Sequence, residues 1–216
     1  MPSTDRKENT ELHAPSDEED SPSFDLETAV DEIDYMLQPP DQDSEYESKR
    51  DRKALDSGRR AQLRRIDTEN SFTPALWHVL FEIDHEEAPG WWKHRENATE
   101  NEWERRWAVL CSAMTRCRGQ HDGRTDDGTR LGVALANAAW AEMRFVRLME
   151  ARERELETQV RHMAQYLAST GESLDWADVG RLLFFQNGDT AQNIRVGISR
   201  AYYGRQQVLE QEADQD

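Results

Sequence analysis

Cysteine is scarce in this chain, with only Cys111 and Cys117 among 216 residues. The two lie six positions apart in a segment that reads as one helix, so their side chains point to different sides of that helix. We therefore predict two buried thiols rather than a disulfide or a metal-binding pair.

The short motifs of common catalytic sites are also missing. The sequence has no HExxH, no Gly-rich phosphate loop, no Cys/His zinc spacing and no GxSxG. The gaps of seven and nine residues between His78, His85 and His94 do not place these side chains on one helical face. We expect a non-enzymatic protein with no catalytic residue, no metal, no cofactor and no small-molecule substrate.

Long apolar runs are absent as well. No stretch of eighteen apolar residues occurs, and the acidic N-terminus is unlike a signal peptide. We expect a soluble, cytoplasmic protein that does not associate with membranes.

Charge is present in quantity but is unevenly distributed. Residues 1–48 carry sixteen acidic and two basic side chains, and four more acids follow Leu209. The remainder, residues 49–209, holds 25 basic and 24 acidic side chains, so the net charge of −17 belongs to the ends. The acidic overall charge therefore does not exclude a nucleic-acid partner.

Arginine dominates the basic residues of this middle part, supplying 22 of the 25. Its rigid fork of donors can hold a phosphate with two hydrogen bonds. The densest stretch, residues 49–65, has eight basic and two acidic side chains. This stretch is the first candidate for a phosphate-binding surface.

The first 48 residues are rich in Ser, Pro, Asp and Glu, a composition that predicts a mostly disordered tail. Within it, Leu26, Val30, Ile33 and Leu37 fall at helical spacing. This segment is either a transient helix that docks on a partner or folds back on the basic stretch, or a solvated tail with chance periodicity.

Helical spacing recurs after residue 49, and no stretch alternates with period two. Ser57 is expected to cap a short helix, Thr73 with Pro74 to open a second, and Asp175 to cap one running to Phe185. Apolar residues form a continuous stripe from Leu131 to Met149, and the last helix is expected to stop at Gly204.

These patterns predict an all-α fold, a helical bundle of two lobes with a disordered acidic N-terminal tail. The expected parts are an acidic tail (1–48), an N-terminal helical lobe (49–118), a connecting loop (119–130), a C-terminal helical bundle (131–208) and a second acidic tail (209–216).

Five short segments occur together in a recognisable order: GRRAQLRR at 58–65, LGVALA at 131–136, EMRFVRLM at 142–149, LDW at 174–176 and AYY at 201–203. In order and approximate spacing they resemble the CasB family, the small subunit of the type I-E CRISPR effector complex, Cascade. The resemblance covers roughly residues 55–205 and leaves the acidic tail outside.

The resemblance implies a subunit that binds nucleic-acid backbone through Arg-rich surfaces and stabilises the target heteroduplex and the displaced strand of the R-loop in antiviral defence. The implied partners are the large and backbone subunits of Cascade, a second copy of this chain, guide RNA and target DNA. R-loop formation is a nearly balanced exchange of duplexes, which modest backbone contacts can tip. The alternative is a protein-binding adaptor that acts through its acidic tail.

By this resemblance, Arg65 matches the second Arg of the family's Leu-Arg-Arg, and Arg144 matches the Arg of Glu-x-Arg-Phe. Arg64 lies about 100° from Arg65 around a helix, so one of the two is expected to face away from a bound strand. Trp140 stands where a relative carries a basic residue. The full set of candidate nucleic-acid-binding residues is Arg59, Arg60, Arg64, Arg65, Arg130, Arg144, Arg147, Arg181, Arg195 and Arg200.

Overall fold

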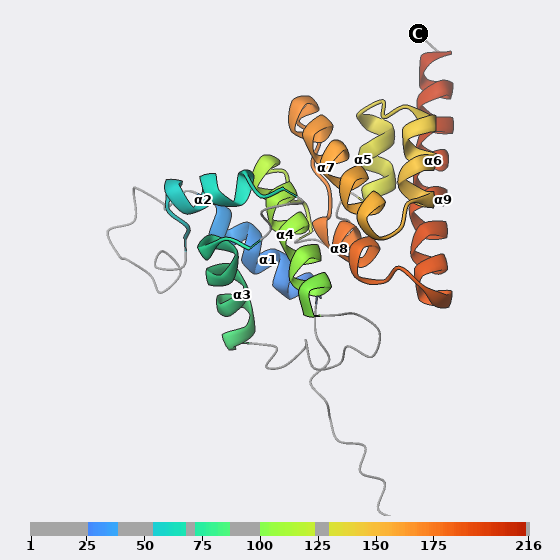
Figure 1. Cartoon of the computed structure of the whole chain (residues 1–216). Coiled ribbons are helices and arrows are strands. Elements are labelled where there is room, and N and C mark those ends of the chain that lie inside the picture. The colour runs from blue at the N-terminus through green and yellow to red at the C-terminus, as the bar shows by residue number, and fades with distance from the viewer. Residues whose placement is uncertain (1–25, 39–53, 68–71, 87–99, 124–129, 215–216) are drawn as a thin grey trace, which may run out of the picture.

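The computed structural model describes residues 26–38, 54–67, 72–86, 100–123 and 130–214, which form nine helices and no strand (Figure 1). The helices are α1 (Leu26–Leu37), α2 (Ser57–Arg64), α3 (Pro74–Glu86), α4 (Glu100–Arg116), α5 (Leu131–Asn137), α6 (Glu142–Glu150), α7 (Glu153–Thr170), α8 (Trp176–Phe184) and α9 (Gly188–Ala213). The predicted all-α class is confirmed. None of these helices is both long and apolar enough to cross a membrane.

The helices form two groups, α1 to α4 on one side and α5 to α9 on the other (Figure 1). Helix α4 packs against both α7 and α8, so one apolar core runs from Ile33 of α1 to Tyr202 of α9. The start of the predicted connecting loop is fixed, because the backbone N–H of Leu174 donates to the carbonyl of Gln120 at 2.9 Å. Residues 124–129 of that loop lie outside the described residues.

Helix α1 is the element that the sequence left undecided. Leu26, Val30, Ile33 and Leu37 are all buried, and the helix packs against α3, α4 and α8. The residue after its C-terminal end meets the basic stretch, where Arg60 donates to the carbonyl of Gln38. The segment is therefore a core helix within the span assigned to the tail. The expected disorder of residues 1–25 and 39–48 concerns positions outside the described residues.

Local capping interactions set the other helix boundaries. The Asp56 carboxylate accepts from the backbone N–H of Arg59 at 2.7 Å, so Asp56 caps α2 and the prediction of Ser57 was wrong. Thr73 and Asp175 precede α3 and α8 and cap them as predicted. Their side chains accept from the backbone N–H groups of Leu76 and Ala177.

Two predictions about where helices continue or end were wrong for backbone reasons. The apolar stripe from Leu131 to Met149 breaks at Ala139, whose φ of 53° turns the chain, and Trp140 N–H bonds back to the Leu135 carbonyl at 2.9 Å. Conversely, α9 continues through Gly204 to Ala213, because Gly204 does not adopt the positive φ that ends a helix.

Both cysteines are free and buried, as predicted. Burial raises the pKa of the Cys111 and Cys117 thiols to about 12.

At pH 8 only about one thiol in ten thousand would then be ionised, and the thiolate is the reactive form. We expect the native protein to resist an aromatic disulfide reagent at pH 8, and the protein unfolded in guanidinium to release two coloured thiolates per chain. Rapid reaction in native buffer would show that α4 opens readily.

Candidate nucleic-acid interface

The first part of the candidate interface is the C-terminal end of α2. Leu63 takes the buried position of this short helix, which leaves the neighbouring Arg64 and Arg65 exposed at its end. Within the described chain, neither guanidinium has a hydrogen-bond or ion-pair partner. Unpaired, exposed guanidinium groups can receive a phosphate without first breaking an internal ion pair.

Two arginines from other helices hold this end of α2 in place. Arg116 of α4 donates to the carbonyl of Arg64 at 2.7 Å, and Arg161 of α7 donates to the carbonyl of Ile66 at 2.7 Å. Burial lowers the pKa of Arg161, and its Nε and Nη2 atoms are buried with no acceptor in the described part of the chain. The backbone beneath Arg64 and Arg65 is thus anchored by two further positive charges.

The remaining α2 arginines are engaged within the fold. Arg59 lies 3.0 Å from the His78 ring nitrogen and 3.7 Å from the Asp56 carboxylate. Arg60 donates to the carbonyls of Leu55 and Gln38, joining the entry of α2 to the end of α1. These contacts give both side chains local structural roles.

The second part is a groove of about 550 Å³ between α6 and α7, here called the α6–α7 groove. Its lining residues are Trp140, Arg144, Arg147, Gln159, His162, Gln165, Tyr166 and Ser169. The lining therefore combines two arginines, a histidine, amides and aromatic rings without any carboxylate. That chemistry suits a polyanion better than a cation or an apolar ligand.

Packing beneath α6 fixes the direction of the groove's arginines. Phe145 is buried and stacks on Tyr202 with ring centroids 3.9 Å apart, which directs the exposed Arg144 and Arg147 away from the core. The Arg144 guanidinium lies 5.4 Å from the centre of the Trp140 ring. Such a cation–π contact orients the guanidinium while leaving its N–H donors available.

Trp140 itself is part of the core, with 3% of its surface exposed. The Tyr166 ring packs edge-on against it at 4.8 Å, and the Tyr166 hydroxyl donates to the Ala138 carbonyl at 2.6 Å. Trp140 thus forms an aromatic support for Arg144.

Two other candidates lie apart from these surfaces. Arg130 is exposed at the residue before α5, and its Nη2 lies beside Gly197 of α9. Arg200 is exposed on α9 and lines a different pocket, next to the end of α6.

The last two candidates are held by internal contacts. Arg181 contacts three carboxylates, those of Glu27, Asp178 at 2.9 Å and Asp175 at 3.9 Å. Arg195 is 7% exposed and donates to the carbonyls of Met149, Ala151 and Ala191. Carboxylates engage Arg181 and carbonyls take three of the five N–H donors of Arg195, so we leave both out of the strand-binding set assigned to α2 and the α6–α7 groove.

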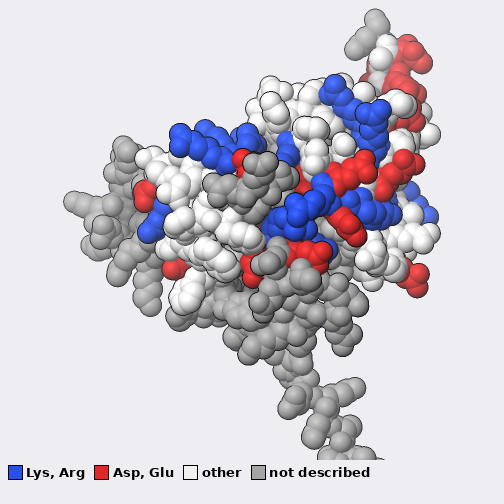
Figure 2. Space-filling model, in the orientation of Figure 1, with Lys and Arg blue, Asp and Glu red and all other residues white. Residues whose placement is uncertain are grey.

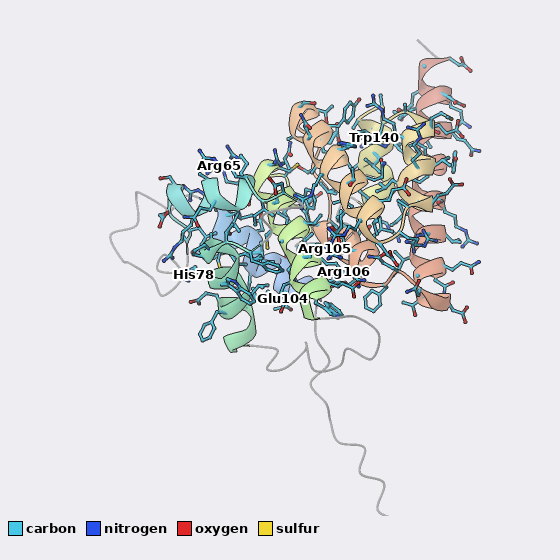
Figure 3. All side chains as sticks on the ribbon, in the orientation of Figure 1. Arg65, His78, Glu104, Arg105, Arg106 and Trp140 are labelled. Carbon is cyan, nitrogen blue, oxygen red and sulfur yellow. The ribbon has the colours of Figure 1, made fainter. Side chains whose placement is uncertain are left out.

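Sequence reasoning missed the groups that position the two surfaces. Arg116 and Arg161 are separated from α2 by long stretches of sequence, and nothing in their local pattern distinguishes them from surface arginines. His162 and Gln165 of the groove lie on the exposed side of α7, and exposure by itself does not indicate a binding role. Arg105 and Arg106 are adjacent arginines of α4 (Figure 3). Both have internal contacts, because Arg105 pairs with Glu157 at 2.7 Å and Arg106 donates to the Phe184 carbonyl at 3.4 Å.

The two surfaces lie along one edge of the molecule. Arg65 on α2 and Trp140 before α6 both occur at the upper edge in Figure 3, and Figure 2 shows Lys and Arg side chains gathered over α2 and over α6 in the same view. The packing order agrees, because α4 contacts both α2 and α7, and α7 contacts α6.

Comparison with known proteins identifies the family of this chain. Residues 59–203 match the family described as CRISPR-associated protein Cse2. The chain belongs to the Cse2 family. This result confirms the resemblance to CasB, the other name of the same small subunit. No curated protein matches the chain.

A solved structure has a similar fold. The chain is similar to one chain of the crystal structure of E. coli Cascade bound to a PAM-containing dsDNA target, with 18% identity and a TM-score of 0.52. The similarity covers 82% of this chain and 95% of the other. The family match spans α2 to most of α9 and leaves α1 and the end of α9 outside.

Proposed function

We propose that this Cse2 protein is a non-enzymatic subunit of a type I-E Cascade complex that binds nucleic-acid backbone with the end of α2 and the α6–α7 groove. In that role it stabilises the target heteroduplex and the displaced strand of the R-loop. Its partners are the large and backbone subunits, a second copy of itself, guide RNA and target DNA, and it acts in the cytoplasm.

One observation carries the proposal. Arg64 and Arg65 have no acidic partner in the described chain, and no carboxylate lines the groove that holds Arg144 and Arg147. Other arginines of this fold are paired with carboxylates, as Arg105 and Arg181 are. The two surfaces are therefore available to an external anion, and backbone phosphate is the anion that a CRISPR complex supplies.

The test measures target binding by the assembled complex across salt concentrations. Each phosphate contact contributes about 0.9 to the log–log salt slope on duplex DNA and about 0.7 on a single strand. We expect Arg65→Ala and Arg144→Ala each to reduce the slope by about one such contact and to weaken binding at low salt.

The matched control is Arg154→Ala, which removes an exposed arginine of α7 that does not line the groove. This control should leave the slope unchanged. Unchanged slopes in both test variants would refute the assigned contacts. If the charge reversals Arg65→Glu and Arg144→Glu also left complex function intact, the adaptor alternative would be favoured.

A further inference from the structure

A second basic site lies where the end of α6 meets the beginning of α9, and it shares no lining residue with the α6–α7 groove. This α6–α9 pocket has a volume of about 640 Å³. Its lining residues are Arg152, Gln186, Asn187, Gly188, Ala191, Gln192, Arg195, Val196, Ser199, Arg200 and Tyr203. Three arginines and several neutral hydrogen-bonding groups line the pocket, and no acidic side chain does.

Arg195 and Arg152 form a fixed pair of like charges in this pocket. Arg195 is buried, and Arg152 donates to the carbonyls of Met149, Glu150 and Ala151 at 2.8–3.1 Å. Burial and the neighbouring Arg152 charge lower the pKa of Arg195 to about 10, with no carboxylate contributing to the shift. Neither guanidinium has a carboxylate partner in the described part of the chain, so no acidic side chain there neutralises the positive charge of the pair.

Donors remain available after the internal contacts are counted. The guanidinium of arginine has five N–H groups. The carbonyls of Met149, Ala191 and Ala151 accept one each from Nε, Nη1 and Nη2 of Arg195. One N–H on each terminal nitrogen is therefore left over, and the exposed Arg200 adds a free guanidinium on the same wall.

The start of α9 adds a further positive element. Asn187, at the N-cap, makes no side-chain capping bond, so the first backbone N–H groups of this 26-residue helix have no side-chain acceptor from the cap. Asp189 lies in the first turn, but it does not line the pocket. Free helical N–H groups beside arginines match the requirements of a phosphate oxygen.

We propose that the α6–α9 pocket binds a phosphate group, with Arg200 and the left-over donors of Arg195 as its ligands and the start of α9 as its third side. The phosphate belongs either to a nucleic-acid backbone or to a free nucleotide. This pocket contains neither Arg65 nor Arg144, so the proposal does not depend on the strand contacts assigned to those two residues.

The experiment titrates the isolated full-length chain with inorganic phosphate and follows backbone amide chemical shifts. We expect saturable shifts at residues 188–191 at the start of α9. Arg200→Glu and Gln192→Glu should each weaken this binding at least tenfold, because each places a carboxylate in the pocket. Both side chains are exposed, so these substitutions should preserve the fold, and the amide spectrum reports this directly.

The matched control is Arg205→Glu, which makes the same charge change on α9 outside the pocket and should bind phosphate as the wild type does. Competition by a single-stranded oligonucleotide would identify backbone phosphate as the source. Competition by a mononucleotide alone would identify a free nucleotide. The proposal would be overturned if inorganic phosphate, the oligonucleotide and the mononucleotide each gave no saturable shifts at the start of α9. Equal phosphate binding by Arg200→Glu and Arg205→Glu would also overturn it.

Discussion

Replacing Gly132 with alanine is expected to lower the free energy of unfolding by roughly 3 kcal/mol. Gly132 is a point of very close approach between α5 and α9. A Cβ at this position would lie 2.2 Å from the carbonyl oxygen of Ile198 and 2.7 Å from the backbone nitrogen of Tyr202. Backbone atoms cannot rotate away as a side chain can, so α9 would have to move as a unit.

Movement of α9 would disrupt its best-packed residue. Tyr202 is fully buried, stacks on Phe145 and donates to the carbonyl of Trp140 at 2.6 Å. Alanine is a better helix former than glycine by about 1 kcal/mol, but this gain is smaller than the expected cost of the clash. Steric exclusion therefore decides the sign of the change.

Urea unfolding followed by tryptophan fluorescence measures the effect, and Gly204→Ala is the matched control. Gly204 lies inside α9 with nothing within 4 Å of its would-be Cβ. This control should raise the free energy of unfolding by up to about 1 kcal/mol through helix propensity alone. Equal stability of the two variants would show that α5 and α9 separate at little cost.

The second large effect concerns α1. Ile33 is fully buried within the common core, so Ile33→Ala should lower the free energy of unfolding by about 2–5 kcal/mol. The cost has two sources, the lost burial of the side chain and the cavity left among α3, α4 and α8. The same urea titration measures it.

Glu27→Gln is the control for α1. Its carboxylate pairs with Arg181, but 65% of that acidic side chain is exposed, so the pair should contribute at most about 1 kcal/mol. If Glu27→Gln lowered the free energy of unfolding more than Ile33→Ala did, the ion pair rather than apolar burial would hold α1 against α3, α4 and α8. If Ile33→Ala and Val30→Ala both changed the free energy of unfolding only slightly, α1 would not belong to the cooperative core.

The candidate site was predicted in part. Arg65 and Arg144 were chosen as candidates because short motifs around them resemble the family, and the nearby Leu63 and Phe145 are buried in the structure. Whether an arginine is free or engaged could not be found this way. Arg181 and Arg195 look like Arg144 in sequence, yet their contacts include Glu27 and Met149, which are distant along the chain.

The sequence by itself determined the helical class, the caps at Thr73 and Asp175, the buried thiols and the family, because these depend on local spacing and short motifs. Tertiary structure alone decided that residues 26–37 join the core, that Ala139 breaks a continuous apolar stripe, and that α9 continues past Gly204. It also brought Arg152, Arg195 and Arg200 into one pocket. The physical reason is that burial, clashes and ion pairs are relations between distant segments, and periodicity describes only one segment at a time.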